Sequence, residues 1–209
     1  MIRLLDLLTF LVNCVNVLIL FLILRTFLPA RKNLAIQIMA VLAGAPLFDA
    51  VVYSNDLPGI LWTLLGFVLY VTVFFRGRWI EKLTAVLVFY PAVIAVNYLT
   101  QDAGSRLFFW LVGADGDAYD EWTYRILFLS TLIHTCCLIL RTLFWLVSWL
   151  SLKRYMKQIL ENLSLQMWMI VDILLIAPAV SIFTIIYFMP ERAVIVYPIC
   201  GAAIFSSFG

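Results

Sequence analysis

The sequence predicts an all-α protein, a polytopic bundle of about seven transmembrane helices with its N-terminus outside the cell and its C-terminus in the cytoplasm. Two observations predict this fold class. The chain has 209 residues, of which 65% are hydrophobic and 12% are charged, whereas about a quarter of the residues of a soluble domain are charged. The apolar residues also gather in segments that approach the 20 residues needed to cross the hydrocarbon layer as a helix.

Seven apolar segments follow one another, separated by short charged or turn-rich stretches. The expected spans are residues 4–28, 34–53, 59–75, 83–99, 124–150, 163–188 and 193–209. The first is too long for the apolar core of a signal peptide and lacks a small-residue cleavage site, so we expect it to be retained. Four of the other spans contain a proline, at Pro46, Pro91, Pro178 and Pro198, where a helix loses a backbone donor and can bend.

The charges between the segments predict the orientation. Nine of the fourteen basic residues fall in the first, third and fifth connections: Arg25, Arg31, Lys32, Arg76, Arg78, Lys82, Lys153, Arg154 and Lys157. The second, fourth and sixth connections carry mainly acids, or one acid with one base. Short cytoplasmic loops are enriched in Lys and Arg, which places the three basic connections in the cytoplasm.

The stretch 100–123 is the longest connection and is expected to lie outside the cell. Its apolar part, LFFWLV, is too short to cross the membrane and suits an interfacial or re-entrant position. The acidic turn GADGDAYDEW follows it. One interpretation makes Phe109, Trp110, Asp115, Asp117 and Trp122 a surface that recognises a ligand; the other makes them an interfacial aromatic belt with solvated acids.

Two charges lie inside predicted spans, Arg141 and Asp172. Each is about nine residues from the basic connector SLKRYMKQILEN, which at 1.5 Å per residue places both roughly 13 Å below the same surface. We therefore expect an ion pair between the fifth and sixth spans, which is either a switch that a ligand biases or a fixed pair that permits insertion. The connector, with Lys153, Arg154 and Lys157, has the apolar periodicity of a short amphipathic helix on the cytoplasmic face.

The outer ends of the first, second, fourth and fifth spans hold further polar candidates. Asp49, Asn97 and His134 are candidate ligand-binding residues. Asp6, Asp49 and His134 together suggest a wet outer cavity. Alternatively, the two acids reach the interface separately and His134 is a hydrogen-bonded residue between helices.

Other chemistry is not indicated. The sequence has no nucleotide-binding glycine loop, Ser/His/Asp order or zinc-protease motif. Its four cysteines lie inside apolar segments without metal-ligand spacing. We expect no catalytic residue within the chain, no metal, no cofactor and no nucleic-acid partner.

The first span ending in LRTFLPARKN and the later FFRGRWIEKLTAVLVFY, within a bundle of six or seven spans, resemble the membrane sensor region of peptide-sensing histidine kinases of the accessory-gene-regulator type, which carry a GHKL-class ATPase domain. The resemblance implies a bacterial plasma-membrane receptor of a two-component system. It further implies quorum sensing through an extracellular peptide or small apolar ligand, and a homodimer.

On this interpretation residues 1–209 form one transmembrane sensor domain, and we expect the chain to be truncated, with any kinase domain following Gly209. The alternative is a small transporter or permease subunit, which would need polar groups along a midplane path and a discontinuous helix. Flux across a membrane would distinguish the two.

Overall fold

The computed structural model describes residues 2–50, 56–112, 124–162 and 165–206. Within these ranges the chain forms seven α-helices and a short 3₁₀ turn, with one isolated β-bridge and no strand. The elements are α1 (Ile2–Phe27), α2 (Leu34–Phe48), α3 (Leu57–Phe74), α4 (Trp79–Val112), α5 (Tyr124–Asn162), α6 (Leu165–Phe188), η2 (Pro190–Arg192) and α7 (Ala193–Ser206). The expected all-helical fold is confirmed.

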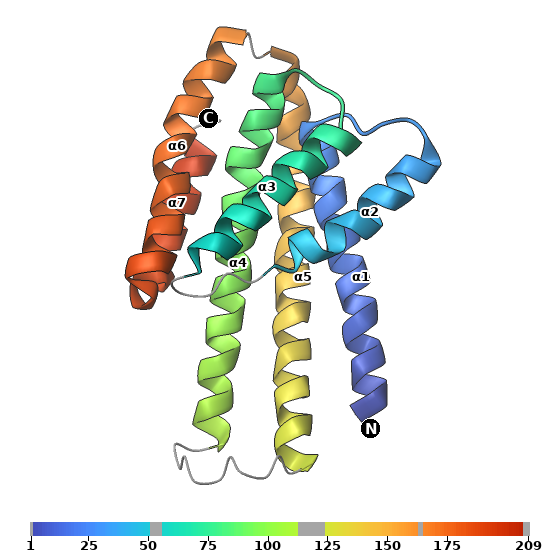
Figure 1. Cartoon of the computed structure of the whole chain (residues 1–209), viewed down its shortest axis with the longest axis vertical. Coiled ribbons are helices and arrows are strands. Elements are labelled where there is room, and N and C mark those ends of the chain that lie inside the picture. The colour runs from blue at the N-terminus through green and yellow to red at the C-terminus, as the bar shows by residue number, and fades with distance from the viewer. Residues whose placement is uncertain (1, 51–55, 113–123, 163–164, 207–209) are drawn as a thin grey trace.

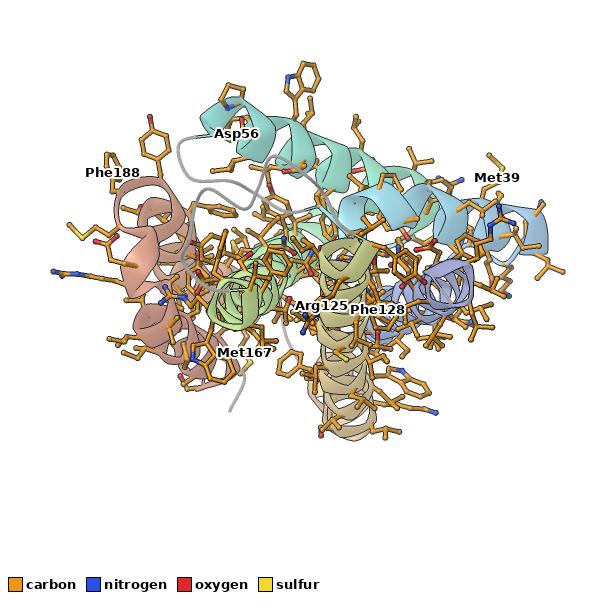
Figure 2. All side chains as sticks on the ribbon, turned by 90° about the horizontal axis from the view of Figure 1, so that it is seen from below. Met39, Asp56, Arg125, Phe128, Met167 and Phe188 are labelled. Atoms are coloured by element: carbon orange, nitrogen blue, oxygen red, sulfur yellow. The ribbon has the colours of Figure 1, made fainter. Side chains whose placement is uncertain are left out.

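The long helices α1, α5 and α4 stand side by side, and α2 and α3 run obliquely across one face of them (Figure 1). α6 and α7 pack together on the far side of α4. The view from below shows the same arrangement, with α2 and α3 on one face and α6 and α7 at one edge (Figure 2). α4 is therefore the central helix, because it contacts α3, α5, α6 and α7.

Three helices end at residues that differ from the expected ends by five residues or more. α4 continues past residue 99 to Val112, so the expected interfacial or re-entrant segment LFFWLV is the last part of a continuous helix. α5 continues through the basic connector to Asn162, so the connector is not a separate helix. α2 ends early, at Phe48. In each case backbone hydrogen bonding, and not the change in composition, decides where the helix stops.

Four helices of the described chain are long and apolar enough to cross a membrane. These segments are Arg3–Phe27, Trp79–Val112, Tyr124–Lys153 and Gln166–Ile185. Three further apolar helices are shorter, at Leu34–Phe48, Pro58–Phe74 and Ala193–Ile204. Large apolar side chains cover much of the outer surface of the bundle, a distribution compatible with a membrane protein.

The first two basic connections meet at one end of the bundle. The backbone N–H of Arg76 donates to the carbonyl of Pro29 at 2.9 Å. The backbone N–H of Arg31 donates to the carbonyl of Phe74 at 3.3 Å. Glu81 closes the start of α4 by accepting from the backbone N–H of Arg78 at 2.9 Å. The C-terminal part of α5, which carries the third basic group, reaches the same end (Figure 1).

An aromatic cluster holds α2 and α3 against α4. Tyr70 of α3 meets Phe48 of α2 edge to face, with ring centroids 5.5 Å apart. Tyr90 of α4 packs on Phe67 at 5.7 Å, and its hydroxyl donates to the carbonyl of Ile60 at 2.8 Å. The C-terminal end of α2 is thereby brought against the middle of the bundle, where the candidate site begins.

Gly77 provides a test of the junction between α3 and α4. Its φ is +143°, and a β-carbon there would lie 2.8 Å from the Glu81 Oε2 and 3.2 Å from a methyl of Leu28. We expect Gly77→Ala to lower the free energy of unfolding by about 1–3 kcal/mol, measured as a lower Tm in detergent. Gly201→Ala is the control, because no atom lies within 4 Å of its β-carbon position; equal Tm values for the two variants would contradict the account.

Candidate functional site

Arg141 is the centre of a buried polar network in the middle of α5. The residue is 6% exposed. Its Nη2 donates to the Oδ1 of Asp49 at 2.5 Å, and its Nη1 donates to the Oδ1 of Asn97 at 3.1 Å. The Asp49 carboxylate is at the edge of the network, with its side chain 44% exposed. The network therefore joins α5, α4 and the C-terminal end of α2.

The same network terminates α2. The last carbonyls of a helix lack intrahelical donors, and Asn97 supplies two: its Nδ2 donates to the carbonyls of Phe48 and Ala50, each at 2.9 Å. The Arg141 guanidinium adds a positive charge next to this end, where the helix dipole favours one. A buried amide and a buried cation thus stabilise a helix end in the interior of the bundle.

The expected ion pair between Arg141 and Asp172 is not formed. Arg141 pairs with Asp49, while the Oδ1 of Asp172 accepts a hydrogen bond from the hydroxyl of Thr84 at 2.5 Å. The reason is the position of α4, which packs against both α5 and α6 and lies between them. Equal depth along two consecutive helices does not make their side chains neighbours when a third helix separates them.

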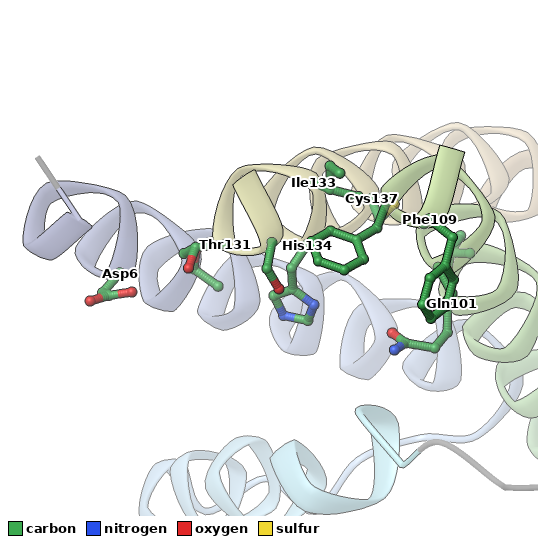
Figure 3. A pocket seen from close by; sticks show the side chains of 13 residues that line it. Asp6, Gln101, Phe109, Thr131, Ile133, His134 and Cys137 are labelled. Atoms are coloured by element: carbon green, nitrogen blue, oxygen red, sulfur yellow. The ribbon is translucent and has the colours of Figure 1, made fainter. Parts of the chain in front are cut away.

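A polar pocket of about 440 Å³ lies between α1, α4 and α5. Its side chains come from all three helices (Figure 3). The lining residues are Asp6, Thr9, Thr100, Gln101, Gly104, Ser105, Phe108, Phe109, Ser130, Thr131, Ile133, His134 and Cys137. This wall offers a carboxylate, an imidazole, an amide and several hydroxyls, so it can hold a ligand through hydrogen bonds.

Close packing and a cross-helix hydrogen bond fix the walls of the pocket. The hydroxyls of Thr9 on α1 and Thr135 on α5 lie 2.7 Å apart and share a hydrogen bond. Gly104 allows α4 to approach α5, because a β-carbon there would lie 2.9 Å from the Sγ of Cys137. Such small residues permit close helix contact in apolar bundles.

The pocket and the network are adjacent along two helices. Gln101 of the pocket comes four residues after Asn97, and Cys137 comes four residues before Arg141. Four residues are about one helical turn, or about 6 Å along the axis. The residues that line the pocket and the groups that hold the end of α2 therefore share the same contact between α4 and α5.

The structure divides the predicted ligand-binding residues into two groups. His134 and Phe109 line the pocket, whereas Asp49 and Asn97 belong to the network. The expected cavity is found at Asp6 and His134 but does not include Asp49. Trp110 is exposed near the end of α4. Three further candidates, Asp115, Asp117 and Trp122, lie outside the described residues.

The cytoplasmic-connector candidates are part of α5. Lys153, Arg154 and Lys157 fall in its last third, and the Lys153 Nζ lies 5.1 Å from the centre of the Trp149 ring. The side chains of Arg154 and Lys157 lie outside the described part of the structure.

Sequence reasoning missed ten of the thirteen residues that line the pocket. Gln101, Gly104, Ser105 and Phe108 are spaced three, one and three residues apart on one face of α4, and Thr131 precedes His134 by three on α5. This helical spacing was the available signal. On α4 this signal was lost because residues 100–123 were interpreted as a connection between helices, in which helical periodicity has no meaning.

In the described ranges, no three His, Cys, Asp or Glu side chains converge as they would around a metal ion. The four cysteines, all described, are unpaired. No protein-family profile, curated protein or solved structure matches the chain.

The network predicts unequal effects of removing its two charges. Asp49→Ala leaves the Arg141 cation buried and short of an acceptor, and we expect it to cost about 3 kcal/mol. Arg141→Met leaves an acid that is 44% exposed at the edge of the network and is not buried, so it should cost less, about 1 kcal/mol. Thermal or denaturant unfolding of each variant in detergent measures the difference.

The double variant provides the control. Because neither charge remains, it should be no less stable than Asp49→Ala alone. Equal losses for the two single variants, or a further loss in the double variant, would contradict the assignment of Arg141 as the buried partner.

Proposed function

We propose that the chain is a multi-pass membrane protein with its basic end in the cytoplasm. The distribution of charge supports this placement. α1 has no charged residue between Asp6 and Arg25, and α4 has none between Lys82 and Asp102. At 1.5 Å per residue both stretches are about 30 Å long, the thickness of the hydrocarbon layer. The two helices therefore indicate the same position for the hydrocarbon layer independently. The polar pocket between α1, α4 and α5, called the outer pocket from here on, lies at the outer boundary of this layer.

Within that membrane the chain is a receptor module that binds a small extracellular ligand in the outer pocket. The observation that carries this proposal is the position of the pocket, one helical turn from the Arg141 network on both α4 and α5. A ligand in contact with Asp6, Gln101 and His134 links α1, α4 and α5, and thereby changes the packing that positions Arg141 and Asn97. The ligand class that the resemblance implies, a short peptide, suits a wall of mixed polar and aromatic groups.

The output of such a receptor is carried by α5. This helix is continuous from the pocket residue Ser130 to Asn162, which at 1.5 Å per residue is about 48 Å. A second route passes from the end of α2 to the junction of the first two basic connections, where Ala30 and Phe75 form a β-bridge. A ligand uses either route only if it binds one arrangement of the helices more tightly than another.

The membrane placement predicts which residues meet the outside. Substituted cysteines in an otherwise cysteine-free chain test it with a membrane-impermeant maleimide. Arg106→Cys should be labelled in intact cells, whereas Arg78→Cys should be labelled only after the cells are permeabilised. The reverse pattern, or equal labelling of both sites in intact cells, would rule out this orientation.

Ligand binding is tested with the purified chain and a panel of short linear and cyclic peptides. A ligand at one hundred times its Kd stabilises the folded state by about 2.7 kcal/mol, so a binding peptide should raise Tm by several degrees. Thr131→Leu fills the pocket and should reduce this shift at least about twofold.

Thr184→Leu is the matched control. Thr184 and Thr131 each donate to a carbonyl four residues earlier, but Thr184 is on the exposed face of α6. An equal loss of the peptide-induced shift in both variants would show that the pocket is not the binding site. Peptide flux into proteoliposomes would instead favour the transporter.

A further inference from the structure

A second, larger pocket extends from the middle of the bundle to its basic end, which it reaches at Phe27 of α1 and Leu152 of α5. It occupies about 810 Å³ between α5 and α7, with α4 behind it. Its wall is almost entirely apolar, and the hydroxyl of Tyr197 is turned to the backbone, donating to the carbonyl of Ile182 at 3.3 Å. The remaining hydroxyls of the wall belong to Ser148 and Ser151. This composition selects a hydrocarbon ligand.

The opening of this pocket is mainly apolar as well. The exposed members of its wall are Phe144, Val147 and Ser151 on α5, and Pro198 and Ala202 on α7. A water-soluble ligand would meet a single exposed hydroxyl there, whereas a hydrocarbon chain that enters from the membrane loses no hydration. In the membrane placement proposed above, on which this inference rests, the opening faces lipid.

The length of the pocket suits one acyl chain. On α4 the wall extends from Val88 to Leu99, a rise of about 16 Å, which is close to half of the 30 Å hydrocarbon layer. On α5 it extends from Phe144 to Leu152, a rise of about 12 Å towards the basic end.

The basic end of the bundle lies directly beyond the pocket. Ser151 and Leu152 belong to the wall, and Lys153 follows them on α5. Anionic lipid headgroups are attracted to Lys and Arg side chains at the cytoplasmic surface. We propose that this pocket binds one acyl chain of an anionic phospholipid from the cytoplasmic leaflet, with the phosphate headgroup at Lys153.

Native mass spectrometry tests this proposal. The chain is reconstituted in vesicles of equal parts phosphatidylglycerol and phosphatidylcholine with identical acyl chains, and is then extracted in mild detergent. We expect the wild type to retain one phospholipid, with the anionic lipid in at least about threefold excess. Gly201→Leu should lower retention about tenfold, because Gly201 lines the pocket and its β-carbon position has no atom within 4 Å.

Two matched controls separate the pocket from its surroundings. Ala203→Leu introduces the same leucine side chain at an exposed position of α7 outside the wall and should retain lipid as the wild type does. Lys153→Gln should abolish the preference for the anionic lipid without abolishing retention, whereas Lys32→Gln, at the same end of the bundle, should keep the preference. Ala202→Leu, at an exposed position of the wall, replaces Gly201→Leu if that variant unfolds.

Several results would overturn the proposal: no lipid retained by the wild type, equal retention in Gly201→Leu and Ala203→Leu, or an unchanged lipid preference in Lys153→Gln. A dimer in the wild type that Gly201→Leu dissociates would assign the pocket to a second copy. None of these readouts involves the outer pocket or a peptide, so failure here leaves the proposed receptor site intact, and failure of peptide binding leaves the lipid site intact.

Discussion

A guanidinium in an apolar bundle must find acceptors, and Arg141 finds them on two other helices. Desolvating a charge without partners costs several kcal/mol, so Asp49 and Asn97 are held where the Arg141 side chain can reach them. Asn97 in turn donates to two carbonyls at the end of α2. The early end of α2, its oblique path and the position of α3 after it are therefore tied to one buried cation.

The long helices impose a second constraint. In the proposed placement, α4 extends beyond Asp102 and α5 extends beyond Lys153, so both leave the membrane as unbroken helices. The outer extension of α4 carries the pocket residues Ser105 and Phe108, and the inner extension of α5 carries the basic group. No loop interrupts α4 or α5 between the two membrane surfaces. A displacement of either helix at one surface is therefore transmitted along the helix to the other.

Much of the fold follows from the sequence, because the position of an apolar segment depends only on local composition. The seven expected segments correspond in order to the seven described helices. Helix ends were less predictable. The stretch from Thr100 to Val112 is polar and aromatic enough to suggest a loop, but it contains no proline, and its backbone simply continues the hydrogen bonding of α4.

The candidate site was predictable only where local sequence was sufficient. His134 and Asp6 could be placed near the outer surface by counting residues along their helices. The partner of Arg141 could not be identified by counting residues. Its identity depends on which helices are neighbours, and α4 separates α5 from α6. The role of Asn97 could not be predicted from local sequence either. Its two carbonyl acceptors lie at the end of α2, and no local sequence pattern predicts that this helix ends at Phe48.

The pair formed by α1 and α5 shows why the outer pocket is a sensitive position. These helices run in the same direction (Figure 1) and form the most extensive helix contact among the described elements. The hydrogen bond between Thr9 and Thr135 joins the two helices beside the pocket, whose wall includes Thr9. Among the described residues neither amide atom of the buried Asn16 has a hydrogen-bond partner.

A buried amide without a hydrogen-bond partner destabilises the folded state. Any small shift of the helices that supplies a partner therefore stabilises it. The Nε of Arg141, on α5, also lacks a partner among the described residues. A ligand that contacts Asp6 on α1 and His134 on α5 acts on the alignment of these two helices. The pocket therefore involves α1 as well as α4 and α5, and α1 is the helix that carries the unsatisfied amide of Asn16.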